Sequence, residues 1–188
     1  MIKEYIIDLY KALECFDCDQ VMDIYYAVKN GDISVTAEDI VPMCKMFTYK
    51  FQDTQPENDQ LIIKMTFDII DRCGVEMGLQ EFVKGLQEIY DVSMADYGDR
   101  KQRGFTYEGL IDYIKYYINA FIAFYDDAHM ILLGRMIKEN GCSGFRERIV
   151  QIMAKDLECY EDDYSRKYKQ ITEDIVGKEK LLIASIKS

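Results

Sequence analysis

Tryptophan is absent from this 188-residue chain, and there are only two prolines and one histidine. Proline interrupts helix interiors, so its scarcity leaves room for long helices. The abundance of Leu, Ile, Met, Glu and Lys also favours helix over strand. A single imidazole, that of His129, excludes His-rich metal centres, because these need several such ligands.

The motifs of common enzyme and nucleotide-binding sites are missing as well. The chain contains no GxxxxGKS/T, GxGxxG or GxSxG pattern. Cys15 and Cys18 form a CxxC pair, but there is no second pair of the kind that a zinc site needs. We therefore expect no catalytic residues, no metal and no cofactor, and we interpret the six cysteines as reduced thiols.

Long apolar runs are also lacking. The longest, from residue 110 to 125, is interrupted by Asp112, Lys115 and Asn119, which makes it too polar to span a bilayer. The first residues enter an amphipathic pattern that contains acids, unlike a signal peptide. These features predict a cytoplasmic protein that does not associate with membranes.

Apolar residues spaced by three and four positions fill most of the chain, which is the pattern of packed amphipathic helices. The most apolar stretch, residues 105–141, predicts two helices that fold back at Asp126 and Asp127, with this pair capping the second helix. The other helices are predicted within residues 2–16, 21–30, 39–51, 61–73, 77–90, 145–157 and 164–185.

Several residues predict where helices begin, end or touch. Asp17 or Asp19 can cap the second helix, and Gly31 can end it. Asp39 suits the start of the third helix better than Thr36, because Pro42 is tolerated only in a first turn. Glycine within a helix costs about 1 kcal/mol relative to alanine. Gly85 is therefore expected at a close contact between helices.

The helices recur as pairs of roughly 35 to 40 residues joined by short turns, as in α-solenoids. We predict an all-α fold of about nine helices stacked as antiparallel hairpins, either a HEAT-like α-solenoid or an irregular helical bundle. Residues 1–188 are expected to form a single domain. The polar stretch 91–104 lacks an apolar period and is where an internal break would fall.

Negative charge is concentrated in the first half of the chain. Residues 1–94 contain 8 Lys/Arg and 18 Asp/Glu, a net charge of −10, whereas residues 95–188 contain 15 and 16, a net charge of −1. Such a field repels nucleic acid and anionic membranes and attracts basic partners. We therefore expect a basic protein partner and no nucleic acid.

Tyrosine is unusually frequent, with 15 residues, and several tyrosines lie beside acids at helix turns. Tyrosine combines a large rigid contact area with a hydroxyl group and is enriched at the centres of interfaces. Neighbouring carboxylates would steer a basic partner towards them. The alternative is that the tyrosines line the edges of a helical core with their hydroxyls in water.

An all-helical chain with HEAT-like segments such as residues 62–90, and with acidic turns that carry tyrosine, resembles bacterial immunity proteins. These small acidic cytosolic inhibitors neutralise a cognate toxin. The resemblance implies a non-enzymatic protein that occludes the active site of a toxin, or an adjacent surface, with acidic and aromatic residues. The toxin would be basic, and a nuclease is one example.

We place the expected contact at two turns. In an up-and-down stack, the turns after the first and third helices lie on the same edge and would form one patch. The predicted partner-binding residues are Glu14, Asp17, Asp19, Asp23 and Tyr26 near the first turn, and Asp53, Glu57 and Asp59 near the second.

Three alternatives remain open at the level of sequence. Carboxylates such as Glu81 and Glu88, or those of residues 161–163, could serve a metal-dependent enzyme, although acidic helix corners explain them more simply. A phage-type inhibitor that mimics nucleic acid would carry acids along one continuous face, which the nearly neutral second half disfavours. The third alternative is a structural helical scaffold.

Overall fold

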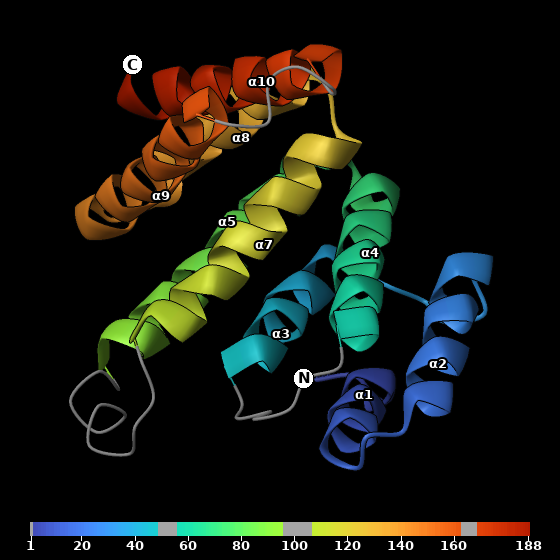
Figure 1. Cartoon of the computed structure of the whole chain (residues 1–188). Coiled ribbons are helices and arrows are strands. Elements are labelled where there is room, and N and C mark those ends of the chain that lie inside the picture. The colour runs from blue at the N-terminus through green and yellow to red at the C-terminus, as the bar shows by residue number, and fades with distance from the viewer. Residues whose placement is uncertain (1, 49–55, 96–106, 163–168) are drawn as a thin grey trace. The chain divides into compact units, whose positions relative to one another are not determined.

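The computed structural model describes residues 2–48, 56–95, 107–162 and 169–188. Every regular element within these ranges is helical (Figure 1), so the fold is all-α, as predicted. The α-helices of the described residues are α1 (Glu4–Glu14), α2 (Cys18–Asn30), α3 (Ile40–Lys45), α4 (Pro56–Cys73), α5 (Val75–Ala95), α7 (Tyr107–Phe124), α8 (Asp127–Asn140), α9 (Ser143–Asp162) and α10 (Lys169–Lys187). Short 3₁₀ helices, η1 (Ala37–Asp39) and η2 (Met46–Thr48), flank α3.

The chain divides into two compact units, Met1–Ile111 and Asp112–Ser188. Helix α7 belongs to the second unit from Asp112 onward. Each unit has its own buried apolar side chains, and each is described by itself below. The predicted single domain over residues 1–188 stays a prediction.

In the first unit, close helix contacts depend on glycine. Gly74, with a φ of +90°, makes the tight connection between α4 and α5. A Cβ on Gly78 would lie 2.7 Å from Ile70 Cα, which brings the start of α5 against the end of α4. A Cβ on Gly85 would lie 2.6 Å from Cys44 Sγ, where α3 packs on α5. The close contact predicted at Gly85 is confirmed.

Local capping agrees with the sequence at two helix ends. The side chain of Asp17 accepts a hydrogen bond from the backbone N–H of Gln20 at 3.0 Å and so caps α2, which ends at Gly31 with a φ of +85°. In the second unit, Asp126 accepts from the backbone N–H of His129 at 3.1 Å and caps α8. These caps were predicted from local sequence alone.

The prediction for Asp39 needs correction. Asp39 does precede α3, but its carboxylate does not cap that helix. It accepts instead from the backbone N–H of Thr36 at 2.9 Å, as half of a reciprocal capping box around η1, and from Lys3 Nζ at 2.7 Å. Asp39 is buried, so this ion pair attaches the start of α1 to η1.

The polar break predicted from residue 91 begins later than expected. Helix α5 continues to Ala95, because Ser93 is buried and its hydroxyl donates to the carbonyl of Ile89 at 2.7 Å. A serine that bonds back to its own helix can remain within it. Residues 96–104 of the predicted break lie outside the described residues.

The second unit is organised by contacts between helices that are not neighbours in sequence. Helix α10 packs extensively on α8 and also contacts α9 (Figure 1). Gly134 of α8 permits this approach, because a Cβ there would collide with Ser185 and lie 2.9 Å from the carbonyl oxygen of Leu182. The core includes Tyr117 and Phe145, both fully buried. Among the described helices, none is both long enough and apolar enough to cross a membrane.

Candidate binding surface in the first unit

Helices α2 and α4 lie parallel, as two contacts at opposite ends show. At their starts, Asn58 Nδ2 lies 3.5 Å from Cys18 Sγ. At their ends, Arg72 donates a hydrogen bond to the backbone carbonyl of Lys29. Both contacts join equivalent ends of the two helices, so the amino termini of α2 and α4 lie side by side (Figure 1).

This parallel pairing gathers carboxylates at one edge of the unit. Asp17 and Asp19 occupy the start of α2, and Glu57 and Asp59 the first turn of α4. The exposed Glu14 ends α1, three residues before Asp17. The positive end of a helix dipole favours acids in the first turn, so the two adjacent amino termini tolerate this charge. We call Glu14, Asp17, Asp19, Glu57 and Asp59 the acidic edge.

The remaining predicted residues divide into two groups. Asp23 and Tyr26 are exposed on α2 and follow Asp19 at helical spacing, so they extend the acidic edge along that helix. Tyr26 is 49% exposed and makes an edge-on contact with Tyr25, their ring centroids 5.2 Å apart. Asp53 lies outside the described residues. The structure therefore brings the predicted residues of the two turns together, except for Asp53.

Phe16 is an aromatic residue at this edge that the sequence analysis missed. It lies between α1 and α2, immediately before Asp17, and its side chain is 50% exposed. The backbone N–H of Phe16 bonds the carbonyl of Leu13 at 3.3 Å, and that of Asp17 bonds the carbonyl of Ala12 at 2.8 Å. These two bonds form the Schellman motif, in which Phe16 occupies the position that glycine usually takes.

The backbone of Phe16 is strained. Its φ of +57° is the one positive value among the non-glycine residues that the structure describes. A left-handed conformation costs a residue with a Cβ about 1–2 kcal/mol. The strained residue thus holds an aromatic side chain with half of its surface in water. Phe16 continues the three- and four-residue spacing of Leu9 and Leu13, so the sequence indicated a buried position at the end of the first helix and gave no signal of its exposure.

A metal-binding arrangement is not evident in the described part of the chain. No group of three or more His, Cys, Asp or Glu side chains among the described residues is placed to hold a metal ion. His129, the single histidine, lies 2.5 Å from Asp126 through Nδ1, and hydrogen bonds with His129 lower the pKa of the Asp126 carboxyl. This pair belongs to the start of α8, where Asp126 acts as a cap.

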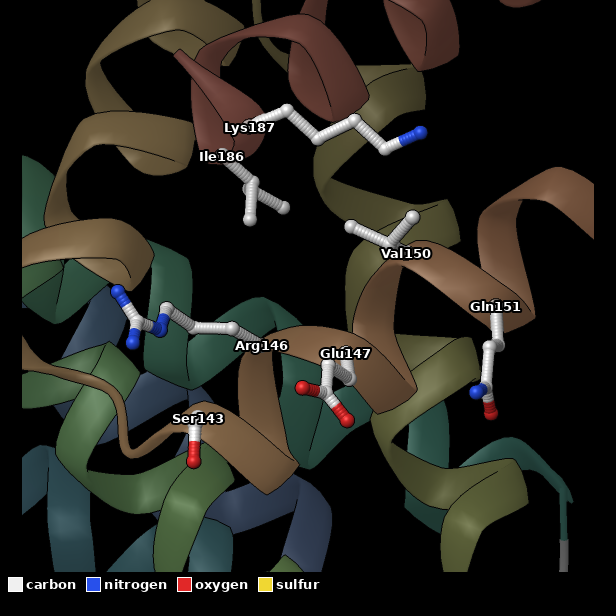
Figure 2. Close-up of a pocket in the computed structure, with 7 residues that line it drawn as sticks. All are labelled: Ser143, Arg146, Glu147, Val150, Gln151, Ile186 and Lys187. Atoms are coloured by element: carbon white, nitrogen blue, oxygen red, sulfur yellow. The ribbon is translucent and has the colours of Figure 1, made fainter.

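A groove of about 430 Å³ lies between α9 and the end of α10 in the second unit (Figure 2). It is lined by Ser143, Arg146, Glu147, Val150, Gln151, Ile186 and Lys187. The charged ends of Arg146 and Lys187 point in opposite directions in Figure 2, with Ile186 and Val150 between them. Arg146 also donates to the backbone carbonyl of Lys138 at 3.1 Å. The groove therefore lacks the convergent polar groups of a typical small-molecule site.

Comparisons of the chain with protein-family models, with characterised proteins and with solved structures found no match.

Proposed function

We propose that this chain is a non-enzymatic binding protein that neutralises a basic protein partner, and that it acts as an immunity protein against a bacterial toxin in the cytoplasm. It would occlude the active site of the toxin or an adjacent basic surface. The observation that supports this proposal most strongly is the exposed, strained Phe16 beside the clustered carboxylates of the acidic edge.

Phe16 has the properties of an interface anchor. Transferring a phenylalanine side chain from water to an apolar pocket contributes roughly 1.5–3 kcal/mol. The half of Phe16 that is exposed in the free protein is available for that gain. Tight interfaces place such aromatic residues at the centre and polar groups at the rim. The exposed Met22, one turn before Tyr26, adds apolar surface to α2, whose amino terminus forms part of the acidic edge.

The acidic edge provides the polar rim and a long-range attraction. Residues 1–94 carry a net charge of −10, and the edge concentrates five of their carboxylates at two adjacent helix starts and the end of α1. Complementary charge accelerates the encounter with a basic surface, and it does so most at low salt. A partner with a basic rim around an apolar pocket would complement both the carboxylates of the acidic edge and the exposed ring of Phe16.

Co-expression tests the proposal directly. The chain is produced together with the protein encoded beside it, and both co-purification and survival of the host cell are scored. We expect a stable complex and protection from a neighbour that is toxic when produced alone. A neighbour that neither binds the chain nor loses its toxicity in its presence would contradict the immunity function.

A further inference from the structure

Glu179 is a buried carboxyl group in the middle of α10. Glu179 is only 1% exposed, and neither of its carboxyl oxygens has a hydrogen-bond partner among the residues that the structure describes. Transfer of an unpaired charge from water into a protein interior is strongly unfavourable. The site therefore favours the protonated, neutral form of this group.

A second buried carboxyl group and one ammonium group face Glu179. Asp156 of α9 is 8% exposed and carries negative charge next to Glu179. Lys115 of α7 lies 2.7 Å from Asp156 Oδ1, and this hydrogen bond raises the pKa of Lys115. Lys115 is thus the one cation beside two carboxyl groups, and its ammonium group is paired with Asp156.

Other charged groups near α10 are directed elsewhere. Lys178, the residue before Glu179, donates to the carbonyl of Ile122 at 3.2 Å and lies 3.3 Å from Asp174. Helix α8 meets α10 at Gly134, and the next residue, Arg135, is exposed. The charged side chains that act on Glu179 are therefore Asp156 from α9 and Lys115 from α7.

Burial is the largest cause of the change in acidity, and the charge of Asp156 adds to it. Together they raise the pKa of Glu179 to about 7, against a smaller opposing effect of Lys115. In the unfolded chain the pKa returns to about 4.5, the ordinary value for glutamate. The folded state therefore keeps a proton that the unfolded state releases between these two pH values.

We propose that Glu179 is a proton-binding switch that fastens α10 to α7 and α9 while its carboxyl group is protonated. Loss of the proton to solvent leaves two buried carboxylates beside one ammonium group. Helix α10 then loosens and uncovers Leu182 and Ile186, which are buried on the same helix. The contribution of Glu179 to stability is complete below pH 4.5 and is lost as the pH rises to about 7.

Hydrogen exchange of the full chain between about pH 5 and pH 9 tests this switch, after correction for the intrinsic exchange rate. We expect the protection of α10 amides to fall by up to about tenfold per pH unit between about pH 5 and pH 7, because opening then releases one proton, and to level off above pH 7, where the folded state has lost the proton as well. Protection of α4, in the first unit, should stay constant. In Glu179→Gln, α10 should be protected independently of pH, and more strongly than in the wild type at pH 8.

Glu173→Gln is the matched control, since it removes the same charge from an exposed position of α10. It should retain the pH profile of the wild type. A wild-type profile without pH dependence, or the same profile in Glu179→Gln, would overturn the proposal. If Glu179→Gln does not fold, the ¹³Cδ chemical shift of Glu179 in the wild type decides. Titration near pH 7 supports the switch, and titration near pH 4.5 contradicts it.

Discussion

Asn58 Nδ2 lies 3.5 Å from Cys18 Sγ, although the two residues are 40 positions apart in the sequence. This contact joins the first turns of α4 and α2, and together with the hydrogen bond from Arg72 to the carbonyl of Lys29 it defines the parallel register of the two helices. Asp17 and Asp19 thereby come to the same end of the pair as Glu57 and Asp59. The acidic edge is consequently a product of tertiary packing, and its charge density depends on that register.

Asn58→Ala should weaken this register. Asn58 is buried, and removal of its amide leaves Cys18 without that hydrogen bond, so we expect a loss of about 1 kcal/mol in the free energy of unfolding. Urea denaturation followed by circular dichroism measures the change. Gln60→Ala, at an exposed position two residues later, should change stability by less than about 0.5 kcal/mol. Equal effects of the two substitutions would contradict the role of Asn58.

Gly85→Ala should destabilise the contact between α3 and α5. The new methyl group would lie 2.6 Å from Cys44 Sγ, and such overpacking costs about 1–3 kcal/mol. Cys44→Ala should restore only part of that loss in the double variant, because it removes Sγ but leaves the Cys44 Cβ position, 2.7 Å from the new methyl group. We therefore expect a favourable coupling energy between the two substitutions. Thermal unfolding of the wild type, the two single variants and the double variant measures it.

Gly177→Ala is the control for Gly85. A Cβ at Gly177 meets nothing within 4 Å, so alanine there should stabilise α10 by about 0.5–1 kcal/mol through its higher helix propensity. A loss of stability in Gly177→Ala, or no loss in Gly85→Ala, would contradict the claim that the space around each glycine determines the effect of alanine there.

Neutralising Asp19 of the acidic edge, together with Asp23, which extends that edge along α2, should slow association with the partner. In the double variant Asp19→Asn/Asp23→Asn, we expect the association rate constant to fall about three- to tenfold at low salt and the dissociation rate constant to change little. The difference should shrink as salt is added, because screening weakens long-range attraction. Surface plasmon resonance over a series of salt concentrations measures both constants.

Glu147→Gln/Glu158→Gln provides the matched control, since it removes two exposed acids from α9 in the second unit. This variant has the same net charge as the edge variant. Equal slowing of association in both variants would assign the effect to net charge and remove the acidic edge from the proposal.

Local features of the fold followed from the sequence because each depends on a few neighbouring residues. Asp17 and Asp126 each cap a helix by accepting from a backbone N–H three residues later, and Gly31 ends α2 through its own φ. Asp39 departed from prediction because Lys3, 36 residues away, takes part in its hydrogen bonding. No pattern in the sequence near Asp39 reveals that partner.

Glu179 shows the same limit at a candidate site. It stands between Lys178 and Lys180, a polar run that indicates a solvent-facing turn of helix. Its burial arises because α7 and α9 supply Lys115 and Asp156 around it. The clustering of the acidic edge was predicted from helix order, whereas the register given by Asn58 and the left-handed backbone of Phe16 required the structure.

The most direct measurement is the affinity of Phe16→Gly for the co-purified partner, taken together with its stability. Glycine relieves the left-handed strain but also removes the buried half of the ring, so the two effects offset and the free energy of unfolding should change by less than about 1 kcal/mol. The same substitution removes the proposed anchor, so the dissociation constant should increase at least about tenfold. Phe124→Ala, at an exposed phenylalanine of the second unit, should leave affinity unchanged. An unchanged dissociation constant in a stable Phe16→Gly protein would contradict the proposal that this edge binds the partner.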